Sequence, residues 1–193
     1  MLPASLLHAA LPTEPDVSGP TSLTGQLLIA APELRQREFD HTVILLAQHN
    51  AAGALGIVIN RPMQERPIAD LLKAFGADAT GVDGTIDIFA GGPVDPTVGF
   101  VLHSAEYHSA DTLDIDSRLA LTIGPDTIRD IGLGKGPRKR LVAFGYAGWA
   151  AAQLESELGQ GVWITTPEDP ELVFDDDRAN VWADALARHK SGR

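Results

Sequence analysis

The chain has 193 residues, of which 44% are hydrophobic and 21% charged, and its acidic side chains outnumber the basic ones to give a formal net charge of −11. This length corresponds to about one domain. The sequence contains no cysteine, which excludes thiol nucleophiles, thiol redox switches, thiolate zinc sites and iron–sulfur clusters. Because non-specific nucleic-acid affinity comes mostly from neutralising phosphates, we do not expect this acidic chain to bind nucleic acid.

The first 22 residues contain four prolines and little periodicity. We therefore expect a disordered tail over residues 1–22, ahead of a single domain that spans residues 23–190. The apolar pair Leu6–Leu7 is not preceded by Lys or Arg, so it makes a poor secretory signal. No run approaches the roughly 18 apolar residues that a membrane helix requires. These observations predict a cytoplasmic protein without membrane contact.

Short apolar runs predict the first buried strands, at residues 26–31, 42–47 and 55–59. The polar, glycine-containing segment 49–53 has the length of a hairpin turn, so the second and third runs are expected to pair as an antiparallel hairpin. Both of these strands are apolar on both faces, which indicates that each face is covered. Pro62 then ends the third run, because proline removes a backbone donor.

Helix-like periodicity follows at Ile68, Leu71, Leu72 and Phe75, and Gly76 ends it. Further strands are predicted at residues 86–90, 98–102, 113–115, 120–123, 141–144 and 162–165, and further helices at residues 127–131, 150–158 and 176–190. Strands interleaved with helices, together with one hairpin, predict an α/β or α+β fold. We expect a single layered domain in which helices pack on a mixed sheet.

Two short clusters at predicted strand ends are candidate binding sites. Asn60 and Arg61 end a strand, where the arginine can present a bidentate fork to a carboxylate or phosphate, or simply pin the loop through a salt bridge. Gly91 and Gly92 follow another strand. Their amides can form an anion-binding nest, or the pair can make a tight turn that needs positive φ.

A third cluster has the form of a strand, a glycine-rich turn and a helix over residues 144–158. Its shape is that of a nucleophile elbow, but Ala147 stands at the serine position, which rules out serine hydrolysis by that route. The aromatic side chains can contact a ligand or partner, or belong to the core. The candidate residues of this cluster are Tyr146, Gly148, Trp149, Gln153 and Glu155.

The six histidines show no compact metal-ligand spacing. We therefore predict neither a metal site nor a cofactor. His103, at the end of a predicted strand, remains a candidate binding residue and a possible general base.

Taken together, these stretches resemble the bacterial YqgE/AlgH family. The matching segments cover about residues 23–189 in order and rough spacing. They are residues 23–30, 53–62, 91–94, 102–103, 145–149, 153–155 and 157–158, with Trp163, Phe174 and Trp182. The resemblance implies a compact α/β domain with a mixed sheet in the bacterial cytoplasm. The family is often labelled as transcriptional regulators, from a genetic association with alginate production, but the resemblance implies no reaction, cofactor or DNA site.

Three functions compete on this sequence. The leading one is a binding or regulatory module that takes a protein partner or a small anionic ligand at the strand ends, where ligand crevices in α/β sheets usually form. The alternative is a small-molecule enzyme, for example a hydrolase, with His103 as general base and Arg61 as electrostatic clamp. The third is a regulator that binds DNA directly, which the net charge disfavours.

Overall fold

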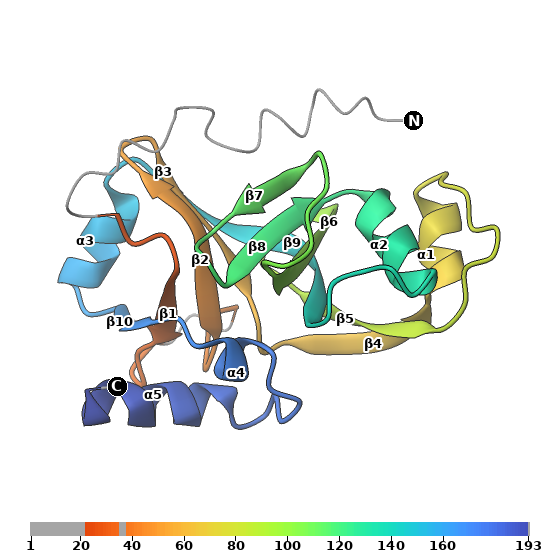
Figure 1. The fold of residues 1–193 in the computed structure, drawn as a ribbon. Coiled ribbons are helices and arrows are strands. Elements are labelled where there is room, and N and C mark those ends of the chain that lie inside the picture. Colours follow the sequence, from red (N-terminus) through yellow and green to blue (C-terminus); the bar gives the residue numbers. More distant parts are fainter. Residues whose placement is uncertain (1–21, 35–37, 193) are drawn as a thin grey trace.

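The computed structural model describes residues 22–34 and 38–192. The expected disordered tail therefore lies, apart from Ser22, outside the described residues. The sheet begins with three antiparallel strands, β1 (Gln26–Ala30), β2 (Val43–Asn50) and β3 (Gly53–Val58), shown in Figure 1. The hairpin predicted between the second and third runs is confirmed, and its strands extend further into the turn than the sequence indicated.

A small peripheral unit follows, made of β4 (Pro62–Pro67), α1 (Ile68–Ala74) and β5 (Thr85–Ala90). The sequence pattern did not indicate β4, because this strand has no buried residue and pairs only with β5. The predicted helix is present. It ends at Ala74, and Gly76, the residue after the C-cap Phe75, has the φ of +70° that is typical of such helix ends.

The next antiparallel unit contains β6 (Val94–Ser104), β7 (Thr112–Asp114) and β8 (Leu119–Ile123), followed by α2 (Pro125–Gly132). Strand β6 starts earlier than expected. Proline at the start of α2 is favourable, since the first helical N–H groups have no partner within the helix.

The largest difference from the sequence prediction is β9 (Arg140–Ala150). This strand continues without interruption through the segment predicted to be a glycine-rich turn. Gly145 has a φ of +75° but bends the strand without ending it. The first half of β9 pairs with β6 and, in parallel, with β5, and its second half pairs with β3. The segment is therefore a strand that joins two parts of the sheet, and the nucleophile-elbow geometry is absent.

The C-terminal part comprises α3 (Gln153–Gly159), β10 (Trp163–Pro167), α4 (Pro170–Val173) and α5 (Val181–Ser191). The predicted last helix starts five residues later than expected, because residues 175–180 form turns ahead of the cap at Asn180. The short helix α4 was not predicted.

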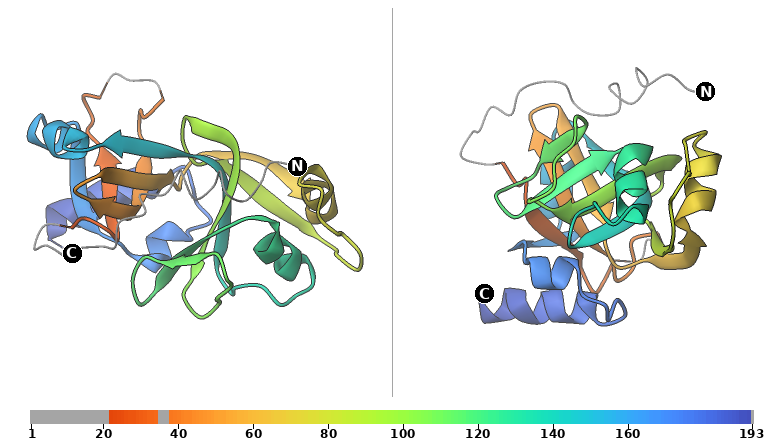
Figure 2. Two further views of the ribbon diagram at one scale, coloured as in Figure 1. Left: turned by 90° about the horizontal axis from the view of Figure 1, so that it is seen from above. Right: turned by 45° about the vertical axis from the view of Figure 1, so that its right-hand side comes forward.

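The strands form one curled sheet in the order β10-β1-β2-β3-β9-β6-β8-β7, with β5 against β9 and β4 outside β5. A large apolar core lies between the inner face of this sheet and the helices α4 and α5. Two smaller clusters lie under α3 and under α1 with α2. Figure 2 shows α3 and α5 at one end of the molecule and α1 and α2 at the other. The architecture is thus a single α+β domain with a mixed sheet, as the sequence predicted.

Candidate functional site

The two glycines that follow β5 pack against residues 143–147 of β9. Gly91 donates its N–H to the Phe144 carbonyl (2.8 Å) and accepts from Val58 N (2.9 Å). Gly92 has a φ of +154°, and a Cβ there would overlap the backbone of Tyr146. The glycines therefore allow close backbone contact, and the Gly91 amide is engaged within the sheet.

Asn60 and Arg61 fix the loop that precedes β2. The Asn60 Oδ1 accepts from Val43 N and its Nδ2 donates to the His41 carbonyl, both at 2.9 Å. The Arg61 guanidinium donates to the Asp40 carbonyl. Both polar side chains thus bond to local backbone, so Arg61 is engaged by a carbonyl and not by the salt bridge that the sequence suggested as an alternative.

His103 lies in the interior between β8 and β9 and has no exposed surface. Its Nδ1 lies 3.0 Å from the Ser104 carbonyl, and its Nε2 lies 2.8 Å from Thr122 Oγ1. Burial lowers the pKa of His103, more than the hydrogen bond to Ser104 raises it. The ring is therefore a neutral donor and acceptor inside a hydrogen-bonded chain, which continues to Thr112.

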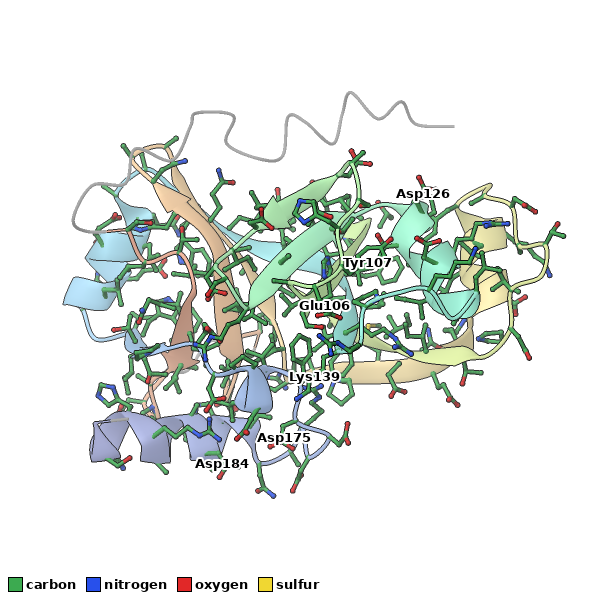
Figure 3. All side chains as sticks on the ribbon, viewed as in Figure 1. Glu106, Tyr107, Asp126, Lys139, Asp175 and Asp184 are labelled. Atoms are coloured by element: carbon green, nitrogen blue, oxygen red, sulfur yellow. The ribbon has the colours of Figure 1, made fainter. Side chains whose placement is uncertain are left out.

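Tyr107 closes this region from the outside. Its ring meets the His103 ring edge-on with a centroid distance of 5.4 Å. The hydroxyl donates to Asp130 on α2 (2.9 Å), and Figure 3 shows Tyr107 beside this helix, on which Asp126 is labelled. A substrate could reach His103 only after this segment opened.

Two tryptophans share one carboxylate on α3. Trp149 Nε1 and Trp163 Nε1 both donate to Glu157 Oε2, at 2.8 and 2.7 Å, while Gln153 Nε2 donates to Glu157 Oε1 at 2.9 Å. Both indoles are buried, and their rings meet edge-on. Gln153 and Trp149 are therefore held by Glu157, a residue that was not among the predicted candidates. Its position four residues after Gln153 on the same helix is the signal that could have found it.

Glu155 turns the other way and joins α3 to the β2–β3 hairpin. Its Oε1 lies 2.9 Å from His49 Nε2, while His49 Nδ1 accepts from Leu23 N at 3.0 Å. The pKa of the Glu155 carboxyl is lowered, chiefly by a backbone hydrogen bond and also by the contact with His49. This candidate residue is thus part of an internal link between two elements.

Three predicted residues do line one shallow hollow on the surface, of about 280 Å³. Tyr146, Gly148 and Trp149 from β9 face residues 52–55 of the hairpin and Val94 of β6. None of the described residues that line it carries a charge. Burial raises the pKa of the Tyr146 hydroxyl, and the nearby Asp95 carboxylate adds to this shift. The hollow offers an aromatic ring, small residues and aliphatic carbon to a contacting group.

A second, larger cleft has a volume of about 700 Å³. It is lined by residues 166–172, from the end of β10 into α4, together with Arg118 and Arg188. No sequence pattern combines these residues, because Arg118 is distant from the others along the chain. The described residues contain no group of three or more His, Asp or Glu side chains placed to hold a metal ion. Nor do they contain a helix long and apolar enough to cross a membrane.

The curled sheet, with the long strand β9 joining its two parts and helices packed on it, makes this chain a single-domain α+β protein. The AlgH protein of Pseudomonas aeruginosa has this fold: its solution structure matches with a TM-score of 0.72 and 37% identity, covering 93% of this chain and 98% of that one. The protein DIP2367 of Corynebacterium diphtheriae shares the fold at a TM-score of 0.65 and 22% identity, covering 95% and 92% of the two chains.

Sequence comparison gives the same result. The model of the AlgH-like family DUF179 matches residues 27–191. A UPF0301 protein of Afipia carboxidovorans is 42% identical over 186 residues, covering 92% of this chain and 89% of that protein. Another, from Methylococcus capsulatus, is 40% identical over 168 residues, with 87% and 92% covered. The chain belongs to the AlgH-like family.

Proposed function

We propose that this protein is a binding module that holds a protein partner at the hollow formed by Tyr146, Gly148, Trp149, Val94 and residues 52–55. The observation that carries the proposal is the lining of this hollow, which the Tyr146 ring, Val94 and small or buried residues form, with no charged side chain from the described part of the chain. Its volume of about 280 Å³ lies below the roughly 300–1,000 Å³ that small-molecule sites usually occupy. A single apolar anchor side chain of a partner suits a hollow of this size.

The charge of the protein favours one kind of partner. The chain carries a net charge of −11, and Asp95 lies near the Tyr146 ring at the edge of the hollow. An apolar anchor flanked by Lys or Arg would gain from this potential, since complementary charge speeds association. We therefore propose a partner segment that presents Leu, Phe or Trp between basic residues, met in the cytoplasm.

A regulatory role of this protein would then be exerted through contact with another protein and not with nucleic acid. A small anion is less suited to the hollow, because the candidate Arg61 does not line it and donates to the Asp40 carbonyl. An enzyme built on His103 is supported less, because that ring is buried with both nitrogens near partners.

Peptide titration followed by two-dimensional NMR tests the proposal. Short peptides with a central Leu, Phe or Trp between lysines are titrated into the labelled protein, beside the same peptide with a central Ala and beside inorganic phosphate. We expect the apolar peptides alone to shift the amide signals of Gly148, Tyr146 and Ala54.

Gly148→Val is the variant that should block binding. Gly148 has no positive φ, and the nearest atom to a new Cβ is the Tyr146 ring at 3.2 Å, so the added side chain enters the hollow without backbone strain. Gly159→Val is the matched control, because nothing lies within 4 Å of its Cβ position. Binding of the apolar peptides that survives Gly148→Val, or signal changes caused equally by the Ala peptide, would refute the proposed site.

A further inference from the structure

The cleft of about 700 Å³ contains a buried carboxyl group that the proposed function does not use. Glu168 follows β10 and is only 6% exposed. Its Oε1 accepts from the Arg118 guanidinium, which also donates to the Glu168 carbonyl at 3.2 Å. Its Oε2 is buried and receives no hydrogen bond among the described residues. An ionised carboxylate with a buried, unsatisfied oxygen is costly.

A second carboxyl group lies beside it. Asp116, in the turn before β8, lies beside the same backbone: its Oδ2 is 3.5 Å from the position of a Cβ at Gly25, whose carbonyl accepts from Glu168 N. The Asp116 Oδ1 already accepts from the backbone N–H groups of Arg118 (2.7 Å) and Leu119 (2.8 Å). Carboxylates have no hydrogen to donate when ionised, so a hydrogen bond between these two groups requires one of them to be protonated.

We propose that Asp116 and Glu168 share one proton, and that this carboxyl pair is a pH-sensitive latch that holds α4 and α5 against the turn before β8. The proton lies on Glu168 Oε2 and is donated to Asp116, which supplies the partner that the buried oxygen otherwise lacks. The latch spans parts distant in the sequence: Glu168 N also donates to the Gly25 carbonyl at the start of β1 (3.2 Å). In Figure 1, α4 and α5 lie together below the ends of β1 and β2, where such a link would act.

The charges around Glu168 agree with this assignment. The pKa of Glu168 is raised to about 7, chiefly by burial and also by the Asp116 carboxylate, against the opposing effect of Arg118. On the helix side, Asp169 pairs with Arg188 of α5, and Glu171 is exposed on the cleft wall. Arg188 is thus paired with Asp169, and among the described residues Arg118 is the cation that contacts the Glu168 carboxyl.

The sign of the pH effect follows from the raised pKa. The folded state binds a proton at Glu168 more tightly than the opened state does, so the latch is strongest below the ordinary pKa of a glutamate and is lost as pH rises through about 7. Between pH 5.5 and pH 8 this linkage predicts an increase of about 30-fold in the equilibrium for local opening of the segment.

Hydrogen exchange measures this opening directly. Exchange of the backbone amides in residues 170–191 of the full chain is followed by mass spectrometry from pH 5.5 to pH 8, after correction for the intrinsic pH dependence of exchange. We expect the opening equilibrium to rise about 30-fold in the wild type. Glu168→Gln retains a hydrogen-bond donor toward Asp116 but does not titrate, so its opening should be independent of pH. Glu171→Gln, on the same cleft wall, should behave as the wild type.

A carbon-13 NMR titration of the Glu168 carboxyl in the wild type gives an answer even if a variant fails to fold. A midpoint near 7 is expected, and Asp116→Asn should lower it, because the substitution removes the neighbouring charge and supplies a donor. A midpoint below 5, or a pH-dependent opening that persists in folded Glu168→Gln, would overturn the latch.

Discussion

Removing the Glu157 carboxylate should destabilise the protein more than removing any exposed acid. In Glu157→Ala, the indole N–H groups of Trp149 and Trp163 lose the acceptor that they share, although both side chains stay buried at 7% and 4% exposure. Gln153 loses its bond to the same carboxylate. The substitution therefore leaves two buried donors unpaired without removing apolar surface from the core.

The expected magnitude follows from these contacts. A buried donor without a partner costs about 1–3 kcal/mol, and the values for hydrogen bonds to charged groups lie toward the upper end. Glu157 itself is only partly buried, so water can replace some of the lost interaction. We therefore expect the free energy of unfolding to fall by about 2–4 kcal/mol. For a chain of this size that lowers the melting temperature by roughly 5–15 °C.

Thermal and urea unfolding followed by circular dichroism measures this loss, and proton NMR reports the two indole N–H signals separately. Glu157→Gln should lose about half as much stability, since one amide oxygen can still accept. Ser156→Ala, on the exposed side of the same helix, is the control. A loss below about 0.5 kcal/mol in Glu157→Ala, with both indole signals unmoved, would show that the shared carboxylate does not stabilise the tryptophan pair.

Three further outcomes are expected. Gly92→Ala should destabilise the fold by about 3 kcal/mol or more, because its φ is positive and the new Cβ meets the Tyr146 backbone; urea unfolding against Gly159→Ala checks this. His103 should titrate with a midpoint below the usual 6.5, because burial lowers its pKa. The fold should lose stability as pH falls below 6.5, since the unfolded chain then takes up a proton that the folded protein does not. An NMR midpoint above 6.5 would contradict this. Burial raises the pKa of Glu106, but hydrogen bonds from Arg138 N and from Ser104 outweigh this effect and bring the pKa to about 2. The ionised carboxylate therefore stabilises the fold above about pH 4.5, and this stabilisation is lost as pH falls toward 2. Acid unfolding should show that Glu106→Gln does not lose this contribution to stability between pH 4.5 and pH 2.

The sequence predicts elements well where burial alone decides them. The runs around Ile29, Leu45 and Ile57 are apolar on both faces because the sheet is covered on both sides, and each is a strand of the core. The pattern fails where pairing occurs without burial: β4 has exposed residues and prolines at both ends, so it shows neither alternation nor an apolar run. It also fails at Gly145, where a glycine typical of turns bends a continuous strand.

The candidate site residues divide in the same way, into those that a local sequence pattern finds and those that it does not. Tyr146, Gly148 and Trp149 are neighbours in the chain, so a local pattern found them, and they meet in one hollow. Asn60, Arg61, Gly91 and His103 were also picked out by position at strand ends, but their polar groups bond to nearby backbone or interior side chains. The proposed pairing of Asp116 with Glu168 joins two turns that lie far apart in the sequence, which no local pattern encodes.

The course of β9 also has a consequence for synthesis on the ribosome. This one strand pairs with β3, β5 and β6, and β1 finds its second neighbour only in β10, near the other end of the chain. Such long-range pairing is slow and leaves apolar strands uncovered until the partners have formed. The nascent chain therefore presents β1, β2 and β3 with their apolar faces unprotected for most of translation. Nascent chains stopped before residue 140 should be retained by chaperones, whereas chains extended past residue 191 should be released as folded protein.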